Sequence, residues 1–356
     1  MVRFLVVVGL FMLSVGCSDQ EERNREEGAN SPDRMETEIS SVQTIASHLE
    51  EPWEIVQFEE RIYVSERNGS IVEIESNEYQ RKPVELDEEL AEEPEAGLLG
   101  LVIPEDFTQT NRAIAYYSYV QEGEVYQRVV AIIEREEVWK EDYTLIDQIP
   151  GGTFHQGGRI EIGPDDKLYV TTGDATEPDL AQNKESLAGK ILRVNLDGSV
   201  PSDNPFPGSL IFSLGHRNPQ GLAWTEGDQL YATEHGNQAH DELNRIQAGA
   251  NYGWPEIEGD QGQSGMQTPI VHSGEETWAP SGLTYYDDHF YFAGLRGEAI
   301  HRYSLDQEQL DVIISGYGRI RDVLATEAGL YFITNNTDGR GNPTSEDDQL
   351  MLKRWE

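Results

Sequence analysis

The feature that most constrains the fold is a weak internal repeat, in which an apolar–tyrosine–apolar core recurs six times along the chain. By subtraction of their positions, successive tyrosines lie 53, 53, 62, 60 and 40 residues apart. Repeats of this length, each with four short strands, are typical of a β-propeller. The sequence therefore predicts an all-β, six-bladed β-propeller with a central-channel active site. The last residues would close the ring beside the first blade. The six tyrosines are Tyr63, Tyr116, Tyr169, Tyr231, Tyr291 and Tyr331.

Turn chemistry and insertions support this organisation. The sequence Gly-Pro-Asp-Asp at residues 163–166, and the pair Asp287 and Asp288, separate apolar stretches and predict tight turns between strands. Two longer insertions, residues 172–186 and 195–209, interrupt the repeat. Loops of this size in a compact domain tend to be functional.

The N-terminus predicts export. Arg3 supplies a positive charge, and residues 4–15 form an apolar core too short to span a membrane in the mature protein. Cys17, the only cysteine of the chain, lies where a lipoprotein peptidase would cut. We expect residues 1–17 to be a lipoprotein signal peptide and Cys17 to carry a lipid; an ordinary secretory signal is the alternative. A single cysteine also excludes an intramolecular disulfide.

The segment after Cys17 has too few apolar residues to fold. Residues 18–40 are rich in Glu, Asn and Ser, and we interpret them as a disordered acidic tether. Residues 41–356 would form the propeller domain, held at an extracytoplasmic membrane surface by the lipid anchor alone.

The charge balance excludes one class of partner. The chain has 26 Lys and Arg against 66 Asp and Glu, a formal net charge of −40. Nucleic acid requires a basic surface, and anionic lipid favours one. In so acidic a chain, arginines clustered at loop ends predict a specific anionic ligand.

Two polar clusters carry candidate chemistry. His155, followed by Gly157 and Gly158, could take a hydroxyl proton near neutral pH, and the glycines allow close approach of a ligand or backbone. Arg217 and Asn218 combine a rigid fork of donors with a donor–acceptor amide. The alternatives are a histidine that caps a turn and an arginine paired with one of the many carboxylates.

A second pair of arginines, Arg319 and Arg321, alternates at the start of an apolar stretch, so both side chains would point to one side. A third polar cluster follows Glu234. Gly236 and Asn237 form a turn with exposed carbonyls, and Asp241 lies nearby. Calcium takes six to eight oxygen ligands, many of them carbonyls, so a calcium site is one interpretation and a charged loop is the other.

These motifs, in this order, resemble the soluble pyrroloquinoline-quinone (PQQ) glucose dehydrogenases, and more closely the bacterial aldose sugar dehydrogenases of the glucose/sorbosone dehydrogenase family. The resemblance covers essentially everything after residue 45. The segments that carry it are 49–53, 66–69, 97–100, 104–107, 155–159, 173–174, 187–193, 203–206, 215–221, 234–255, 279–282 and 319–322.

The resemblance implies PQQ- and calcium-dependent oxidation of an aldose at C1 to its lactone. His155 would be the general base, hydride would pass to the quinone, and Arg217 would stabilise charge on the quinone oxygens. Electrons would leave to an external acceptor. Further cofactor contacts would come from Asn218, Arg319, Arg321, Glu95 and Asp174, and metal ligands from Gly236 and Asn237, with Asp241 beside them.

Three positions depart from the family pattern. Asn237 replaces the usual proline of the calcium turn, and the segment ending at Trp278 lacks the expected Trp-x-Pro wall over the sugar. Arg296 stands near the position of a cofactor-binding lysine. A calcium-dependent sugar lactonase and a non-catalytic binding propeller therefore remain alternatives, and monomer and homodimer are both open.

Overall fold

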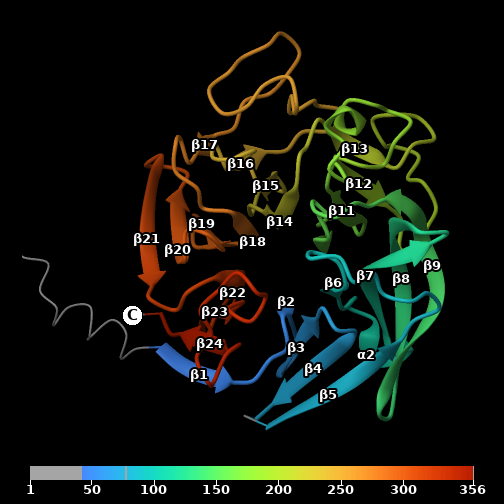
Figure 1. Ribbon diagram of the computed structural model, residues 1–356, viewed down its shortest axis with the longest axis vertical. Coiled ribbons are helices and arrows are strands. Elements are labelled where there is room, and N and C mark those ends of the chain that lie inside the picture. The colour runs from blue at the N-terminus through green and yellow to red at the C-terminus, as the bar shows by residue number, and fades with distance from the viewer. Residues whose placement is uncertain (1–41, 77, 356) are drawn as a thin grey trace, which may run out of the picture. The chain divides into compact units, whose positions relative to one another are not determined.

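The computed structural model describes residues 42–76 and 78–355, which form an all-β unit (Figure 1). Its strands are arranged in four four-stranded sheets and one eight-stranded sheet. In chain order they are β1 Val42–Ala46, β2 Pro52–Phe58, β3 Arg61–Glu66, β4 Ser70–Glu75, β5 Glu78–Glu85, β6 Leu98–Val102, β7 Arg112–Gln121, β8 Glu124–Arg135, β9 Val138–Pro150, β10 Ile160–Ile162, β11 Leu168–Thr172, β12 Lys190–Val194, β13 Ile211–Leu214, β14 Pro219–Trp224, β15 Leu230–Glu234, β16 Glu242–Arg245, β17 Val271–His272, β18 Pro280–Tyr286, β19 His289–Gly294, β20 Ala299–Ser304, β21 Gln309–Ser315, β22 Ile320–Thr326, β23 Gly329–Thr334 and β24 Leu350–Lys353.

The eight-stranded sheet consists of two four-stranded halves. Its order is β2-β3-β4-β5-β9-β8-β7-β6, and the halves meet in a short parallel pairing of β5 with β9. Within each half, every pairing is antiparallel, as in the four smaller sheets. Counting the halves separately gives an arrangement consistent with six blades.

Here, a strand group is one four-stranded sheet or one half of the eight-stranded sheet. The tyrosine repeat marks the same position in every strand group. Each of the six tyrosines lies in the second strand of its group: β3, β7, β11, β15, β19 or β23. Tyr63 and Tyr116 are completely buried, and Tyr169, Tyr231 and Tyr291 nearly so. The repeat read from the sequence is therefore a structural repeat.

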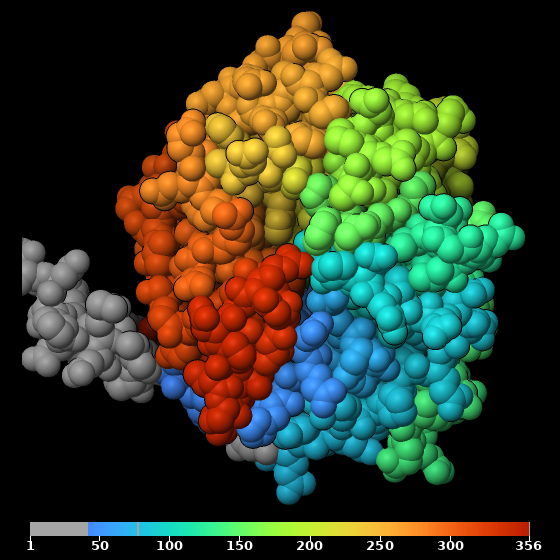
Figure 2. Space-filling view, viewed as in Figure 1, coloured from blue at the N-terminus to red at the C-terminus, as the bar shows by residue number. Residues whose placement is uncertain are grey.

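The first strands of the groups pack against one another around the middle of the unit. β2 contacts β6 and β22, β18 contacts β14 and β22, and β6 contacts β10; β14 packs on β11 to complete the circle. The space-filling view shows the segments closely packed around a narrow central hollow (Figure 2). Residues at the ends of these first strands are thus brought together from distant parts of the sequence.

The N-terminal strand completes the last sheet. β1 pairs antiparallel with β24, giving the order β1-β24-β23-β22. Closure of the ring by the two ends of the domain follows the prediction, although it is β1 that joins the last group. The core lies between neighbouring groups, where side chains such as Phe332 are fully buried. A buried side chain of this kind contributes about 1.5–3 kcal/mol.

Both predicted turns are present. Asp287 and Asp288 form a two-residue connection between β18 and β19, and both have positive φ (49° and 60°), as a type I′ hairpin turn requires. In the turn at 163–166, the N–H of Gly163 donates to the carbonyl of Lys167 at 2.8 Å, and Asp166 has a φ of 57°.

The predicted insertions are loops. The first holds a single 3₁₀ turn, Pro178–Ala181, and the other short helix of the described residues is α2, Phe107–Thr110. A third long loop, residues 246–270, was not singled out from the sequence. No helix in the described part of the chain is long and apolar enough to cross a membrane. The predicted signal peptide, Cys17 and the tether lie outside the described residues.

Candidate functional site

A pocket of about 100 Å³ collects side chains from four strand groups and from the loop between β5 and β6. Five arginines line it, together with Glu95, Gln220 and His235. The predicted cofactor residues Glu95, Arg296, Arg319 and Arg321 thus lie in one pocket. Arg67, Arg340, Gln220 and His235 had not been assigned to the site from the sequence. The five arginines are Arg67, Arg296, Arg319, Arg321 and Arg340.

Arg321, the second residue of β22, is 5% exposed and is held by neutral groups. Its Nη2 and Nε donate to Oδ1 of Asn335 at 2.9 and 3.2 Å, and its Nη1 donates to Oε1 of Gln220 at 3.0 Å and, more weakly, to Ser281 Oγ at 3.5 Å. Burial, and then the positive charge of Arg319, lower the pKa of Arg321 to about 9. A buried guanidinium held only by neutral groups is costly unless an anion joins it.

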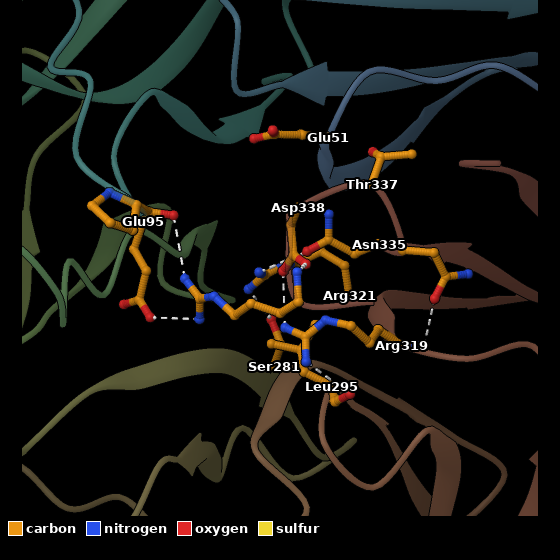
Figure 3. A network of polar contacts seen from close by, with 12 residues as sticks. Glu51, Glu95, Ser281, Leu295, Arg319, Arg321, Asn335, Thr337 and Asp338 are labelled. Atoms are coloured by element: carbon orange, nitrogen blue, oxygen red, sulfur yellow. Dashed lines mark hydrogen bonds and ion pairs between the residues drawn. The ribbon is translucent and has the colours of Figure 1, made fainter. Parts of the chain in front are cut away.

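Arg319 lies beside Arg321, as the predicted alternation requires (Figure 3). Its Nη2 donates to Asp338 Oδ2 at 2.9 Å and its Nη1 to the Leu295 carbonyl at 3.3 Å. Its buried Nε has no hydrogen-bond partner in the described part of the chain. Asp338 pairs with Arg319 and not with Arg321, so the two guanidiniums together retain positive charge.

Glu95 joins this pocket to the predicted base. Its Oε1 accepts from Arg340 Nη1 at 3.1 Å, and its Oε2 accepts from the main-chain N–H of His155 at 2.9 Å. Burial alone would raise the pKa of Glu95, but the hydrogen bond from His155 and nearby cationic groups, Arg340 among them, hold that pKa below its ordinary value. Glu95 therefore remains an anion that orients the backbone of His155.

His155 and Asp174, assigned separately from the sequence, form a hydrogen-bonded pair. His155 Nδ1 lies 2.7 Å from Asp174 Oδ1, and the Asp174 side chain is fully buried. The main-chain N–H of Thr176 also donates to Asp174 Oδ1, at 2.8 Å. When Nδ1 carries its proton toward Asp174, the lone pair is on Nε2, which is the arrangement a general base requires. Asp174, predicted as a cofactor contact, is therefore first of all the hydrogen-bond partner of His155.

The backbone at His155 is strained and closely packed. His155 has a φ of 64°, in the left-handed region that non-glycine residues seldom occupy. A Cβ on Gly173 would lie 1.8 Å from the His155 carbonyl oxygen, so only glycine fits there. The glycines of this cluster therefore allow backbone to approach backbone.

Arg217 and Asn218 connect the first two polar clusters. The Asn218 side-chain oxygen accepts from the N–H of Gly157 at 3.0 Å, and the Arg217 carbonyl accepts from the N–H of Asp174 at 2.8 Å. The Arg217 guanidinium lies over the ring of Trp254, 5.3 Å from its centroid. Burial lowers its pKa, although nearby carboxylates oppose this, and its Nε has no partner among the described residues.

The predicted metal loop is held by its own carboxylate. Asp241 Oδ1 accepts from the N–H of Gly236 at 2.9 Å, and Oδ2 accepts from the main-chain N–H groups of Trp278 and Ala279 at 2.6 and 2.8 Å and from Thr277. These contacts account for Asp241 as the residue that fixes the turn. Its role as a ligand stays a prediction, as do the carbonyls of Gly236 and Asn237.

Side chains alone do not form a metal centre in the described residues, which hold no group of three or more His, Cys, Asp or Glu placed to bind one ion. A calcium ion here would depend on main-chain carbonyls.

The other two positions that depart from the family pattern are also placed. Trp278 is buried, and its ring packs on the rings of Phe292 and His301, with centroids 5.5 Å apart in each case. Arg296 is exposed and lines the pocket.

His235 is the residue that sequence reasoning missed at the centre of the site. Burial lowers its pKa to about 3, so the ring is neutral, and its Nε2 has no partner in the part of the chain described. Its carbonyl accepts from Arg217 Nη1 at 3.4 Å. His235 directly precedes the predicted calcium turn, and this position in the sequence could have indicated that it belongs to the site.

Known proteins share this architecture. The pattern of the Glucose / Sorbosone dehydrogenase family matches residues 49–347. An uncharacterized protein of Synechocystis sp. is 33% identical over 69% of this chain and 70% of its own length. The aldose sugar dehydrogenase YliI of Escherichia coli is 27% identical over 84% of this chain and 91% of its own length.

A solved structure extends the comparison. The PQQ-bound form of the aldose sugar dehydrogenase from Streptomyces coelicolor superposes with a TM-score of 0.81 at 36% identity, over 88% of this chain and 98% of the other. The relatives include PQQ-dependent sugar dehydrogenases, and the structural neighbours share the all-β fold. With a family match over most of the chain and a pocket of arginines beside a His–Asp pair, this protein belongs to the glucose/sorbosone dehydrogenase family.

Proposed function

We propose that residues 41–356 are a PQQ- and calcium-dependent aldose dehydrogenase on a six-bladed propeller, which oxidises the C1 hydroxyl of a cyclic sugar to the lactone. The observation that carries the proposal is Arg321, a buried guanidinium with neutral partners in a pocket of five arginines. Such a pocket, in a chain of net charge −40, fits a small polyanion.

PQQ is such a polyanion, because it carries three carboxylates, and it supplies the hydride acceptor when bound. Arg319 and Arg321 would hold its carboxylates, with Asn218 and Arg296 as further contacts. The unpartnered Nε atoms of Arg217 and Arg319 and Nε2 of His235 are donors or acceptors that a bound group could complete.

The base would be His155. Its Nδ1 faces Asp174, so Nε2 can take the proton of the sugar hydroxyl while the carboxylate stabilises the imidazolium that forms. The guanidinium of Arg217, aligned by its backbone and by Trp254, would stabilise negative charge that develops near it. The carbonyls of Gly236 and Asn237 would hold calcium, with Asp241 maintaining the turn.

The experiment is a titration of residues 41–356 with PQQ, with and without calcium, followed by dye reduction with a panel of aldoses. We expect sugar-dependent reduction that needs both quinone and calcium. His155→Gln should abolish turnover and leave quinone affinity intact, whereas Arg319→Ala with Arg321→Ala should weaken affinity on the order of 100-fold. An unaltered titration curve for the double variant would refute the arginine assignment.

The alternatives give different results in the same assay. A lactonase would hydrolyse lactones without quinone, and would need carboxylates rather than arginines around the pocket. A binding propeller would take up a sugar without turnover under any condition.

For the N-terminus we propose secretion, lipidation at Cys17 and a tether over residues 18–40, which would place the enzyme outside the cytoplasm on a membrane. Labelled palmitate should be incorporated by the full chain and not by Cys17→Ser. Equal labelling of both would overturn the anchor.

A further inference from the structure

Trp254 touches Arg217, one of the two predicted catalytic residues, and Asp174, the hydrogen-bond partner of the other. Its indole Nε1–H donates to Asp174 Oδ2 at 2.8 Å, and its ring lies under the Arg217 guanidinium. The sequence marked Trp254 as part of a motif and gave it no role. It lies in the loop of residues 246–270, far along the chain from His155.

The backbone of Trp254 is fixed on two sides. Its N–H donates to the carbonyl of Gly215 at 3.0 Å, and its carbonyl accepts from Gln182 Nε2 at 2.6 Å. The Gln182 side chain also bonds Asn251, in the same loop. The indole is therefore anchored before any substrate arrives.

Asp174 depends on this indole. Its Oδ1 is shared by His155 and the N–H of Thr176, whereas its Oδ2 accepts from Trp254. A hydrogen bond to a carboxylate withdraws part of its negative charge and fixes its plane. The strength with which Asp174 attracts a proton on His155 is thus set in part by Trp254.

We propose that Trp254 is a positioning residue of the active site, which sets the basicity and orientation of His155 through Asp174 and supports Arg217 through its ring face. The kinetic part of this inference rests on the proposed function; the part that concerns His155 and Asp174 does not. The other charged groups around His155 are Glu95, bonded to its N–H, and beyond it Arg217 and Arg340, and the neutral His235 is the further titratable group. The substitutions below leave all of them in place.

The test is Trp254→Phe, which keeps an aromatic ring under Arg217 and removes the N–H. Without that donor Asp174 carries more negative charge, so the His155 ring should hold its proton to higher pH. We expect its NMR titration midpoint, followed in histidine-labelled protein without quinone, to move to higher pH than in the wild type. The signal is assigned by its absence from His155→Gln, since the chain has eight histidines.

In the loaded enzyme, the acid limb of the kcat/KM profile should shift in the same direction. We expect kcat to fall on the order of tenfold with little change in quinone affinity, the effect of one lost hydrogen bond to a charged group. Trp224→Phe is the matched control, because Trp224 packs edge-on against Tyr169 and, within the described part of the chain, makes no hydrogen bond or ring contact with His155, Asp174 or Arg217. It should behave as the wild type.

If Trp254→Phe does not fold, benzothienylalanine at position 254 replaces only the N–H by sulfur and keeps the shape of the indole. A His155 titration and a pH profile that match the wild type in a folded variant would overturn the inference. If the wild type does not oxidise sugars at all, the proposed function fails, and the NMR titration still decides the link between Trp254 and His155.

Discussion

Arg321 provides the sharpest test of the site, because replacing it should separate stability from binding. In Arg321→Met the side chain keeps much of its length and loses its charge. Without cofactor, we expect this variant to unfold less readily than the wild type and to bind PQQ far more weakly. Residues selected for a ligand often lower the stability of the empty protein in this way.

The magnitude follows from the burial of the guanidinium. A fall in pKa from 12.5 to about 9 corresponds to roughly 5 kcal/mol of destabilisation of the charged form. Against this gain, the substitution leaves Asn335 Oδ1 and Gln220 Oε1 without their donor, at about 1–3 kcal/mol together, because Gln220 lines the pocket and can meet water. The net expectation is a gain of about 2–4 kcal/mol in the free energy of unfolding.

The assay is urea unfolding of residues 41–356 without quinone, and the matched control is Arg159→Met. Arg159 is as deeply buried but pairs with Glu54 at 2.8 Å and Asp322 at 3.1 Å. Breaking those pairs strands two carboxylates, so the control should lose about 3–5 kcal/mol. If Arg321→Met loses stability as Arg159→Met does, Arg321 is a structural residue and the reasoning is wrong.

Three further substitutions probe other parts of the molecule. Burial, opposed by Arg159 and aided by Asp322, raises the pKa of Glu161 from 4.5 to about 7. The native state therefore holds a proton that the unfolded chain releases, and stability falls as pH rises from about 4.5 to 7. Glu161→Gln should remove up to roughly 3 kcal/mol of this loss, seen as a gain over wild type in urea melts at pH 8 but not at pH 4. Asp241→Ala should cost about 3 kcal/mol by releasing four donors at the metal turn, and a loss under 1 kcal/mol in the same melts would contradict that. Lys190→Met should leave stability within about 2 kcal/mol of the wild type. Its Nζ donates to three carbonyls of the loop that follows Asp174, but burial also lowers the pKa of Lys190 to about 7, so removing the charge offsets the lost hydrogen bonds; a loss as large as that of Asp241→Ala would refute this.

Much of the fold could be predicted because the repeat is local. Each apolar–tyrosine–apolar core specifies one second strand, and acidic residues with positive φ, such as Asp166, Asp287 and Asp288, lie in the turns beside it. The pairing of β1 with β24 is not local, since it joins residues some three hundred positions apart and depends on the whole ring closing. The sequence therefore predicted closure and not which strand would complete the last sheet.

The site was predictable where chemistry is concentrated in a motif. Arg319 and Arg321 lie at the start of β22, and the packing of first strands around the centre brings them into one pocket with Gln220 of β14. His155 and Arg217 lie in the loops before β10 and β14. What could not be predicted were contacts made by loops. Arg340 reaches Glu95 across 245 positions, and Trp254 reaches Asp174 across 80. Nothing in the local sequence of a loop specifies such a partner.

The strongly acidic composition of the chain makes the lack of a carboxylate partner at Arg321 informative. The chain has 66 Asp and Glu for 26 Lys and Arg, so carboxylates are available to pair with every arginine. Arg159, for example, pairs with two carboxylates, Glu54 and Asp322. Arg321 is equally buried, yet amides and a hydroxyl surround it. A fold that only had to stabilise itself would gain by placing a carboxylate or an apolar side chain there. No carboxylate is among its hydrogen-bond partners in the described part of the chain, which indicates that the negative charge that Arg321 requires is supplied from outside the chain. This is why a polyanionic cofactor accounts for the pocket better than a neutral sugar alone.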